Sequence, residues 1–314
     1  MLSRVAERIY WLARYLERIE NIARLVSVYD NLLYDLPRGN NISWYNLIVI
    51  NGSTDLFHER YKVQSERNVV KFLLADEDNF ASLLSSIRML RENIRTSRDV
   101  IPAETWEQIN ELYIYVRDNI SQGVNRSKRH QFLTKVIESC QMITGLLVGA
   151  MTRDAGWYFL ILGCNIERAD MTTRVLDAGT FLAMEPFEDA RVNLTQVIWS
   201  KVLRSQSAYL TYRRSVRRAI RPSNVVNYLL NDEQFPRTFH YCIEQMDSAA
   251  EHLPRGDNVR SVVKEIQALK YVVESSQDLT DDFRSYLNEL QIKLMELNDA
   301  IVENWFAFKE EYAA

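Results

Sequence analysis

Two charged motifs with one pattern lie 150 residues apart in this chain. Glu17-Arg18-Ile19-Glu20-Asn21-Ile22-Ala23-Arg24 and Glu167-Arg168-Ala169-Asp170-Met171-Thr172-Thr173-Arg174 both read Glu-Arg-x-acid-x-x-x-Arg. Carboxylates can bind amines or transfer protons, and a guanidinium can bind carboxylate or phosphate through two parallel hydrogen bonds. Positions i, i+3 and i+7 share one face of a helix. Each motif therefore places two carboxylates and one guanidinium on one face.

Two interpretations of this face remain open. The residues can form buried arginine–carboxylate networks, paired across a pseudo-symmetry axis, because charges at the end of an apolar helix need partners. Alternatively, they can line a polar cleft that binds a charged small molecule or a peptide end. The candidate ligand-binding residues are Glu17, Arg18, Glu20, Arg24, Glu167, Arg168, Asp170 and Arg174.

A second repeat suggests that the motif belongs to a duplicated unit. Residues 69–77 (VVKFLLADE) align without a gap with residues 225–233 (VVNYLLNDE), at an offset of 156 residues. No linker rich in Gly, Ser or Pro separates the two halves, which favours one domain over two. We therefore predict a single domain over residues 1–314, built from repeat units of about 1–150 and 151–314.

The composition favours helices and a soluble protein. Hydrophobic residues make up 47% of the chain and charged residues 25%, with nine glycines and six prolines. The net charge of −4 argues against a general nucleic-acid binder. Three widely spaced cysteines, Cys140, Cys164 and Cys242, fit reduced thiols in the cytoplasm. The most membrane-like region, residues 142–164, is split by Arg153 and Asp154, so we expect buried core helices and no membrane span.

Hydrophobic periodicity predicts an all-α fold, a multi-helix bundle of two pseudo-symmetric halves. Residues 155–162 are apolar on every side, which predicts a buried helix, and Gly156 and Gly163 would let a second helix approach closely. The predicted helices cover residues 3–35, 67–99 with a break near 76–79, 103–122, 127–151, 155–184, 189–220, 224–231, 239–252, 257–276 and 280–311.

Two groups of arginines stand outside the motifs. The first group, on one predicted helix face, aligns with acidic residues or proline in the second half, which suggests mutual pairing or specialisation of one half. Its members are Arg88, Arg91, Arg95 and Arg98. The second group predicts the basic face of an amphipathic helix, either solvated or docking an acidic or phosphate-bearing partner. Its members are Arg213, Arg214, Arg217, Arg218 and Arg221.

No self-sufficient catalytic motif occurs in the sequence. It contains no phosphate-binding Gly-x-x-x-x-Gly-Lys loop, no Gly-x-Gly-x-x-Gly and no Gly-x-Ser-x-Gly. Di-metal sites in helical bundles use Glu-x-x-His, and this chain has no such motif. We therefore predict no metal and no cofactor.

The chain resembles the Alpha-E family, bacterial all-helical proteins with a recurring Glu-Arg motif. The resemblance covers essentially the whole sequence, with Leu90, Ile94 and Thr238 as conservative departures. The matching segments are residues 2–20 (LSRVAERIYWLARYLERIE), 75–76, 90–95 (LRENIR), 98–99, 104–107 (ETWE), 109–110, 166–177 (IERADMTTRVLD) and 235–237 (FPR).

The resemblance implies a genomic context and no established reaction. Such proteins are typically encoded beside a permuted ATP-grasp-like protein, a transglutaminase-like peptidase and sometimes a proteasome-related peptidase. This grouping implies a system that forms or trims amide bonds on a peptide or small molecule.

Two hypotheses follow. In the first, the protein is a non-catalytic partner of an ATP-grasp-type ligase that helps bind a charged amino-acid or peptide substrate, with Arg91 and Arg95 as further candidates for phosphate or carboxylate contact. The transglutaminase-like peptidase would be a second partner. In the alternative, the protein is itself an enzyme that acts on amide or peptide bonds. A Glu with a raised pKa in the Glu/Asp–Arg cleft would then serve as general base.

Overall fold

The structure, a computed structural model, describes residues 3–35, 43–184 and 191–307. These residues form helices and no strand, which confirms the all-α class. In chain order the helices are α1 (Ser3–Asp35), α2 (Asn46–Ile50), α3 (Thr54–Arg60), α4 (Glu66–Leu74), α5 (Leu83–Arg95), α6 (Ala103–Val124), α7 (Arg126–Ala150), α8 (Ala155–Met184), α9 (Arg191–Ser205), α10 (Tyr209–Ser215), α11 (Pro222–Asn231), α12 (Phe239–Glu251), α13 (Asp257–Ala268) and α14 (Asp281–Ile301), followed by a π-helical turn (Val302–Phe306).

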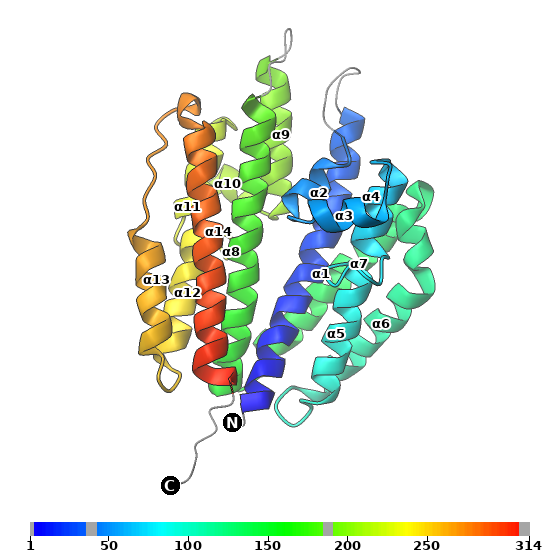
Figure 1. The fold of residues 1–314 in the computed structure, drawn as a ribbon, viewed down its shortest axis with the longest axis vertical. Coiled ribbons are helices and arrows are strands. Elements are labelled where there is room, and N and C mark those ends of the chain that lie inside the picture. The colour runs from blue at the N-terminus through cyan, green and yellow to red at the C-terminus, as the bar shows by residue number, and fades with distance from the viewer. Residues whose placement is uncertain (1–2, 36–42, 185–190, 308–314) are drawn as a thin grey trace.

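The two long motif-bearing helices, α1 and α8, lie side by side at the centre of the molecule (Figure 1). Helix α1 packs against α5 and α7, whereas α8 packs against α12 and α14. Helix α6 contacts both α5 and α7, and α13 contacts both α12 and α14. The helices on each flank thus surround one of the two motif helices.

Helices α1 and α8 run in the same direction (Figure 1) and approach closely at Tyr10 and Gly163, ahead of the two charged motifs. A Cβ atom on Gly163 would lie 2.2 Å from the carbonyl oxygen of Tyr10, which is closer than any real contact. The prediction that Gly163 permits a close helix approach is therefore confirmed. None of residues 155–162 is exposed, in agreement with their apolar composition.

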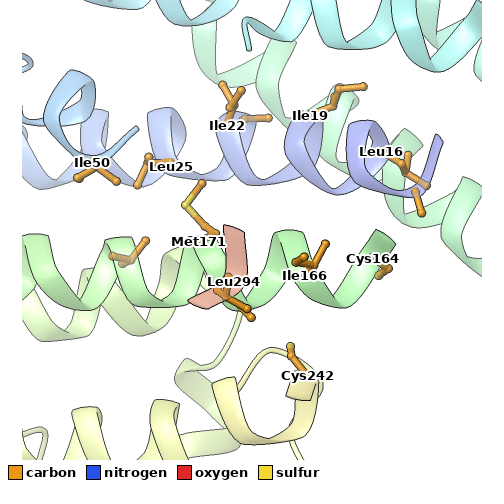
Figure 2. Close-up of a cluster of buried hydrophobic side chains, with 14 of the residues drawn as sticks. Leu16, Ile19, Ile22, Leu25, Ile50, Cys164, Ile166, Met171, Cys242 and Leu294 are labelled. Carbon is orange, nitrogen blue, oxygen red and sulfur yellow. The ribbon is translucent and has the colours of Figure 1, made fainter. Parts of the chain in front are cut away.

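The hydrophobic core extends on both sides of this central pair. Figure 2 shows part of it, with buried side chains contributed by α1, α2, α8, α12 and α14. On α1, Ile9, Leu12, Leu16 and Ile19 are all buried. Their spacing of three or four residues is the pattern that predicted this helix, and its bounds agree with the predicted 3–35.

The turns directly before α5 and α12, which we call corners, have matching cap residues. Ser82 caps α5 by accepting a hydrogen bond from the Ser85 N–H, and Thr238 caps α12 by accepting one from the Tyr241 N–H. Helix α12 begins and ends 156 residues after α5. Ala81 and Arg237 therefore occupy matching positions, each directly before its cap residue. Descent of the two halves from one unit stays a prediction.

The predicted helix over residues 189–220 is wrong. Helix α9 ends at Ser205 because Ser207 adopts a left-handed conformation with φ of 56°. The Ser207 and Ala208 N–H groups then donate to the carbonyls of Arg204 and Leu203, in the Schellman pattern of a helix end. Glycine usually occupies this position at a helix end. Because the residue here is a serine, the sequence did not indicate that the helix ends.

The amphipathic arginine face predicted in the same region is also wrong. Helix α10 ends at Ser215, and Arg217 is left-handed with φ of 53°. Arg213 and Arg214 therefore lie in the last turn of α10, whereas Arg218 and the other later arginines follow in non-helical chain. Three further predicted helices run past the observed ends, because α5 ends at Arg95, α13 at Ala268 and the α14 segment at Phe306. Positions 189–190 and 308–311 of the predictions lie outside the described residues.

One helix among the described residues, α7, is long and apolar enough to span a membrane by length and composition alone. Core helices of soluble proteins pass the same test. Within this fold α7 packs against α1 and α6, and its Phe132, Leu133 and Val136 have no exposed surface.

Candidate functional site

The two motifs face each other across the α1–α8 interface and exchange ion pairs. Arg18 on α1 donates from Nε to Glu167 Oε1 at 2.6 Å and from Nη2 to Glu167 Oε2 at 3.0 Å. In the opposite direction, Arg168 on α8 donates from Nε to Glu17 Oε1 at 2.8 Å. The arginine of each motif thus neutralises the first glutamate of the other motif.

The carboxylates of the first motif are buried in a cluster of charged side chains, which we call the first cluster: Glu17, Glu20, Arg24, Arg168 and Arg237. Arg24 donates to Glu20 Oε1 at 2.8 Å within α1. Arg237 also donates to Glu20 Oε1, at 3.1 Å, and its Nη1 lies 3.2 Å from Glu17 Oε2. The second contact is an ion pair without hydrogen-bond geometry.

Two uncharged partners complete the first cluster. The Cys164 thiol donates to Glu17 Oε1 at 3.2 Å, and Arg237 Nη1 donates to Asn21 Oδ1 at 3.0 Å. The Thr172 hydroxyl on α8 also donates to the Arg237 carbonyl at 2.9 Å, which anchors this corner to the central pair. The first cluster is therefore tied to α1, α8 and the start of α12.

The carboxylates of the second motif lie in a more open cluster, which we call the second cluster: Arg14, Arg18, Glu167, Asp170 and Arg174. Arg14 donates from Nε to Glu167 Oε2 at 3.0 Å, so Glu167 receives two guanidinium groups. Within α8, Arg174 donates to Asp170 Oδ2 at 2.8 Å. This ion pair has the same i, i+4 spacing as that of Glu20 and Arg24.

Electrostatics keeps the paired glutamates ionised. Burial raises the pKa of Glu167, but the nearby Arg18 and Arg14 outweigh it and hold the pKa at about 2. Burial likewise raises the pKa of Glu17, and Arg168 and Arg237 outweigh it, so this pKa also lies below the ordinary value. Neither glutamate has the raised pKa of a general base at neutral pH.

The neighbouring thiols have the opposite shift. Burial raises the pKa of Cys164 well above its usual value, and it raises the pKa of Cys242 to about 12. Both side chains are buried. They remain protonated and poorly nucleophilic at neutral pH.

A polar cavity of about 320 Å³ opens beside the second cluster. All five members of that cluster line it, together with residues of α14 and with Asn51 and Ala81. From α14, Asn298 accepts hydrogen bonds on Oδ1 from Arg14 Nη1 at 2.7 Å and from the Tyr10 hydroxyl at 2.9 Å. The cavity wall is therefore held in place by bonds among three helical segments.

A second cavity, of about 250 Å³, adjoins the first cluster. Glu17, Cys164 and Arg168 contribute to its wall, but most of its lining is apolar, including Trp157 and Leu147. The two motifs thus adjoin cavities of different character.

Arg91 and Arg95 do not join the motif residues. The guanidinium of Arg91 lies 4.8 Å from the ring centre of Tyr113, and its Nε donates to Asn110 at 2.8 Å. Arg95 pairs with Glu92 on the exposed face of α5. The other arginines of the same stripe also find partners within the first half, since Arg88 pairs with Glu77. Of the two alternatives, mutual pairing and specialisation of one half, pairing between the halves does not occur in the described contacts.

Sequence reasoning missed two of the residues that complete the clusters. Arg14 lies one turn before Arg18 on the same face, so the i, i+4 spacing could have identified it. Arg237 was noted in the resemblance only as part of a turn, and no local pattern connects it with Glu17 or Glu20. Among the described residues no group of three or more His, Cys, Asp or Glu could hold a metal ion.

Comparisons with known proteins agree with the helical architecture. The family model for Alpha-E, described as a predicted alpha-helical domain with a conserved ER motif, matches residues 1–306. Uncharacterised proteins of Mycobacterium bovis and Mycobacterium tuberculosis are 23% identical in an alignment of 277 positions that covers 80% of this chain. The chain spans about 30% of the length of these relatives. No solved structure matches it. Since the family model covers nearly every residue, the chain belongs to the Alpha-E family.

Proposed function

We propose that this protein is an accessory subunit of an ATP-grasp-type system that forms amide or peptide bonds, and that it helps bind a charged amino-acid or peptide substrate. The observation that carries the proposal is the polar cavity beside the second cluster, which offers both guanidinium and carboxylate groups. These groups complement the carboxylate and ammonium of an amino acid. The ATP-grasp partner is the expectation that the family resemblance implies.

The alternative, an enzyme with a glutamate general base, has less support. Glu17 and Glu167 each accept arginine hydrogen bonds that lower their pKa, so both are weak bases at neutral pH. A glutamate poised for proton transfer would instead have a pKa near the working pH. These glutamates are therefore better suited to binding and orienting a ligand than to removing a proton from it.

The proposed partner role can be tested with purified full-length proteins. We expect this chain to co-elute with the ATP-grasp-like protein that the family resemblance predicts as its genomic neighbour. It should also raise the ligase's ATP turnover in the presence of amino acids or short peptides. A transglutaminase-like peptidase can be added as the second expected partner. The buffer should contain a thiol reductant, because we propose a cytoplasmic location. Separate elution together with unchanged ATP turnover would contradict the proposal.

A further inference from the structure

The two motif copies differ in the residue that lies beside them at the corner before the flanking helix. One copy has a long charged side chain there, and the other has only a methyl group. In the first cluster, the corner before α12 supplies Arg237, whose guanidinium reaches both Glu17 and Glu20. At the matching corner before α5, the residue is Ala81, which lines the polar cavity. The space that a long side chain fills beside one motif is therefore left open beside the other.

Exposure of the second acidic residue follows this difference. The Glu20 side chain is 5% exposed and its partner Arg24 is 14% exposed. The Asp170 side chain is 28% exposed and its partner Arg174 is 25% exposed. The same i, i+4 ion pair is thus enclosed in the first cluster and accessible from the cavity in the second.

The second cluster still contains three guanidinium groups, although no arginine enters it from the corner before α5. Arg14 supplies the third guanidinium there, at a position that aligns with Cys164 in the other motif. Both carboxylates of the second motif therefore have an arginine partner without a side chain from the corner. The charged lining of the cavity is balanced, with Arg14, Arg18 and Arg174 against Glu167, Asp170 and Asp299.

We infer that the cavity beside the second motif copy is the ligand site, and that in the first copy Arg237 occupies the corresponding place beside Glu20 and encloses it. The ligand class is a small zwitterion, either a free amino acid or a short peptide, and this assignment rests on the function proposed above. Its cationic group would lie beside Ala81 and close to Asp170. This position corresponds to that of the Arg237 guanidinium, which lies beside Glu20 in the first cluster. Its carboxylate would contact the cavity arginines. The volume of about 320 Å³ suits such a ligand, because small-molecule sites begin near about 300 Å³.

Filling the cavity with the arginine that the other corner carries tests this inference. Binding would be measured by NMR or calorimetry on the full chain, with single L-amino acids and the dipeptide Ala–Ala at millimolar concentration as probes. Acetate and methylammonium serve as probes of one charge. We expect at least one zwitterion to bind more tightly than either single-charge probe. Ala81→Arg should weaken that binding by at least about tenfold, because its guanidinium competes for the same carboxylates.

Phe80→Arg is the matched control, because the Phe80 side chain is 83% exposed and does not line the cavity. This variant should bind as the unmodified protein does. If Ala81→Arg fails to fold, Asp170→Asn carries the test and should show a loss of similar size. Failure of every zwitterion to bind the unmodified protein, or full binding by Ala81→Arg or Asp170→Asn, would overturn the inference. Because co-elution with the ligase is a separate measurement, the partner role could survive that result.

Discussion

Arg18 on α1 and Glu167 on α8 form a two-point ion pair, with donor–acceptor distances of 2.6 and 3.0 Å. The pair Arg168–Glu17 repeats it in the opposite direction. A Glu-Arg dipeptide on two adjacent parallel helices can thus cross-link them twice, because each helix supplies one acid and one base. This exchange explains why the dipeptide occurs in both copies, and it gives the motif a structural role before any ligand is considered.

Removing the charge of Glu167 should destabilise the fold. Glu167→Gln leaves Arg14 and Arg18 without their carboxylate in a largely buried site. Breaking a buried pair in this way costs about 3–5 kcal/mol. Urea unfolding followed by circular dichroism would measure the loss.

Glu92→Gln provides the comparison for that experiment. Glu92 forms an exposed ion pair with Arg95, in which each side chain is 52% exposed. Solvent screening limits such pairs to less than about 1 kcal/mol. Equal losses in the two variants would show that the Glu167 network contributes no more than a surface pair.

Lowering the pH should reduce the free energy of unfolding of the unmodified protein, and part of this loss should come from protonation of Glu167. Its pKa falls from 4.5 to about 2 in the folded state. A lowered folded pKa contributes stability above the unfolded pKa, and that stability is lost as the pH falls from about 4.5 towards 2. At about 1.4 kcal/mol per pKa unit the contribution is on the order of 3 kcal/mol.

The pH dependence is best measured as a difference. We expect the gap in unfolding free energy between the unmodified protein and Glu167→Gln to narrow between about pH 7 and about pH 3. Urea titrations at several pH values would show this. A gap that stays constant with pH would mean that Glu167 titrates alike in the folded and unfolded chains.

Gly163 should tolerate no side chain, whereas Gly145 should accept one. A Cβ on Gly163 would meet the Tyr10 carbonyl, so Gly163→Ala must push α1 and α8 apart, at a cost of about 1–3 kcal/mol or more. Nothing lies within 4 Å of a Cβ on Gly145, so Gly145→Ala should stabilise α7 by about 0.5–1 kcal/mol. Thermal unfolding of both variants is the measurement, and a neutral Gly163→Ala would contradict the close approach.

Much of the fold follows from local patterns in the sequence. The apolar spacing in residues 3–35 and 155–184 predicted α1 and α8 with the observed bounds, because long amphipathic or buried helices have a strong periodic signal. The break at Ser207 was missed because the residue that adopts the left-handed conformation there is a serine, whereas glycine usually marks such a helix end.

The site was predictable only in part. The motif placed the carboxylates on one face, but the sequence could not show that the two faces meet and exchange partners, because that depends on how α1 packs against α8. The role of Arg237 depends on the same tertiary arrangement, since 217 residues separate it from Glu20. The open corner at Ala81 became recognisable only by comparison with Arg237.

The central claim is that a ligand binds at Asp170 in the second motif copy, whereas the equivalent Glu20 in the first copy is enclosed and stabilises the fold. Glu20→Gln and Asp170→Asn test it most directly. These residues hold the same position in the two motifs. We predict that Glu20→Gln lowers the unfolding free energy by about 3 kcal/mol or more, because it leaves Arg24 and Arg237 poorly paired. It should leave amino-acid binding intact in the folded protein.

Asp170→Asn should show the reverse, with a stability change below about 1 kcal/mol because its ion pair is partly exposed. It should also lose amino-acid binding by at least about tenfold. Both quantities, the unfolding free energy and the dissociation constant of the tightest-binding amino acid, would be measured on both variants. Equal effects of the two substitutions on stability and on binding would contradict the division of roles between the two copies.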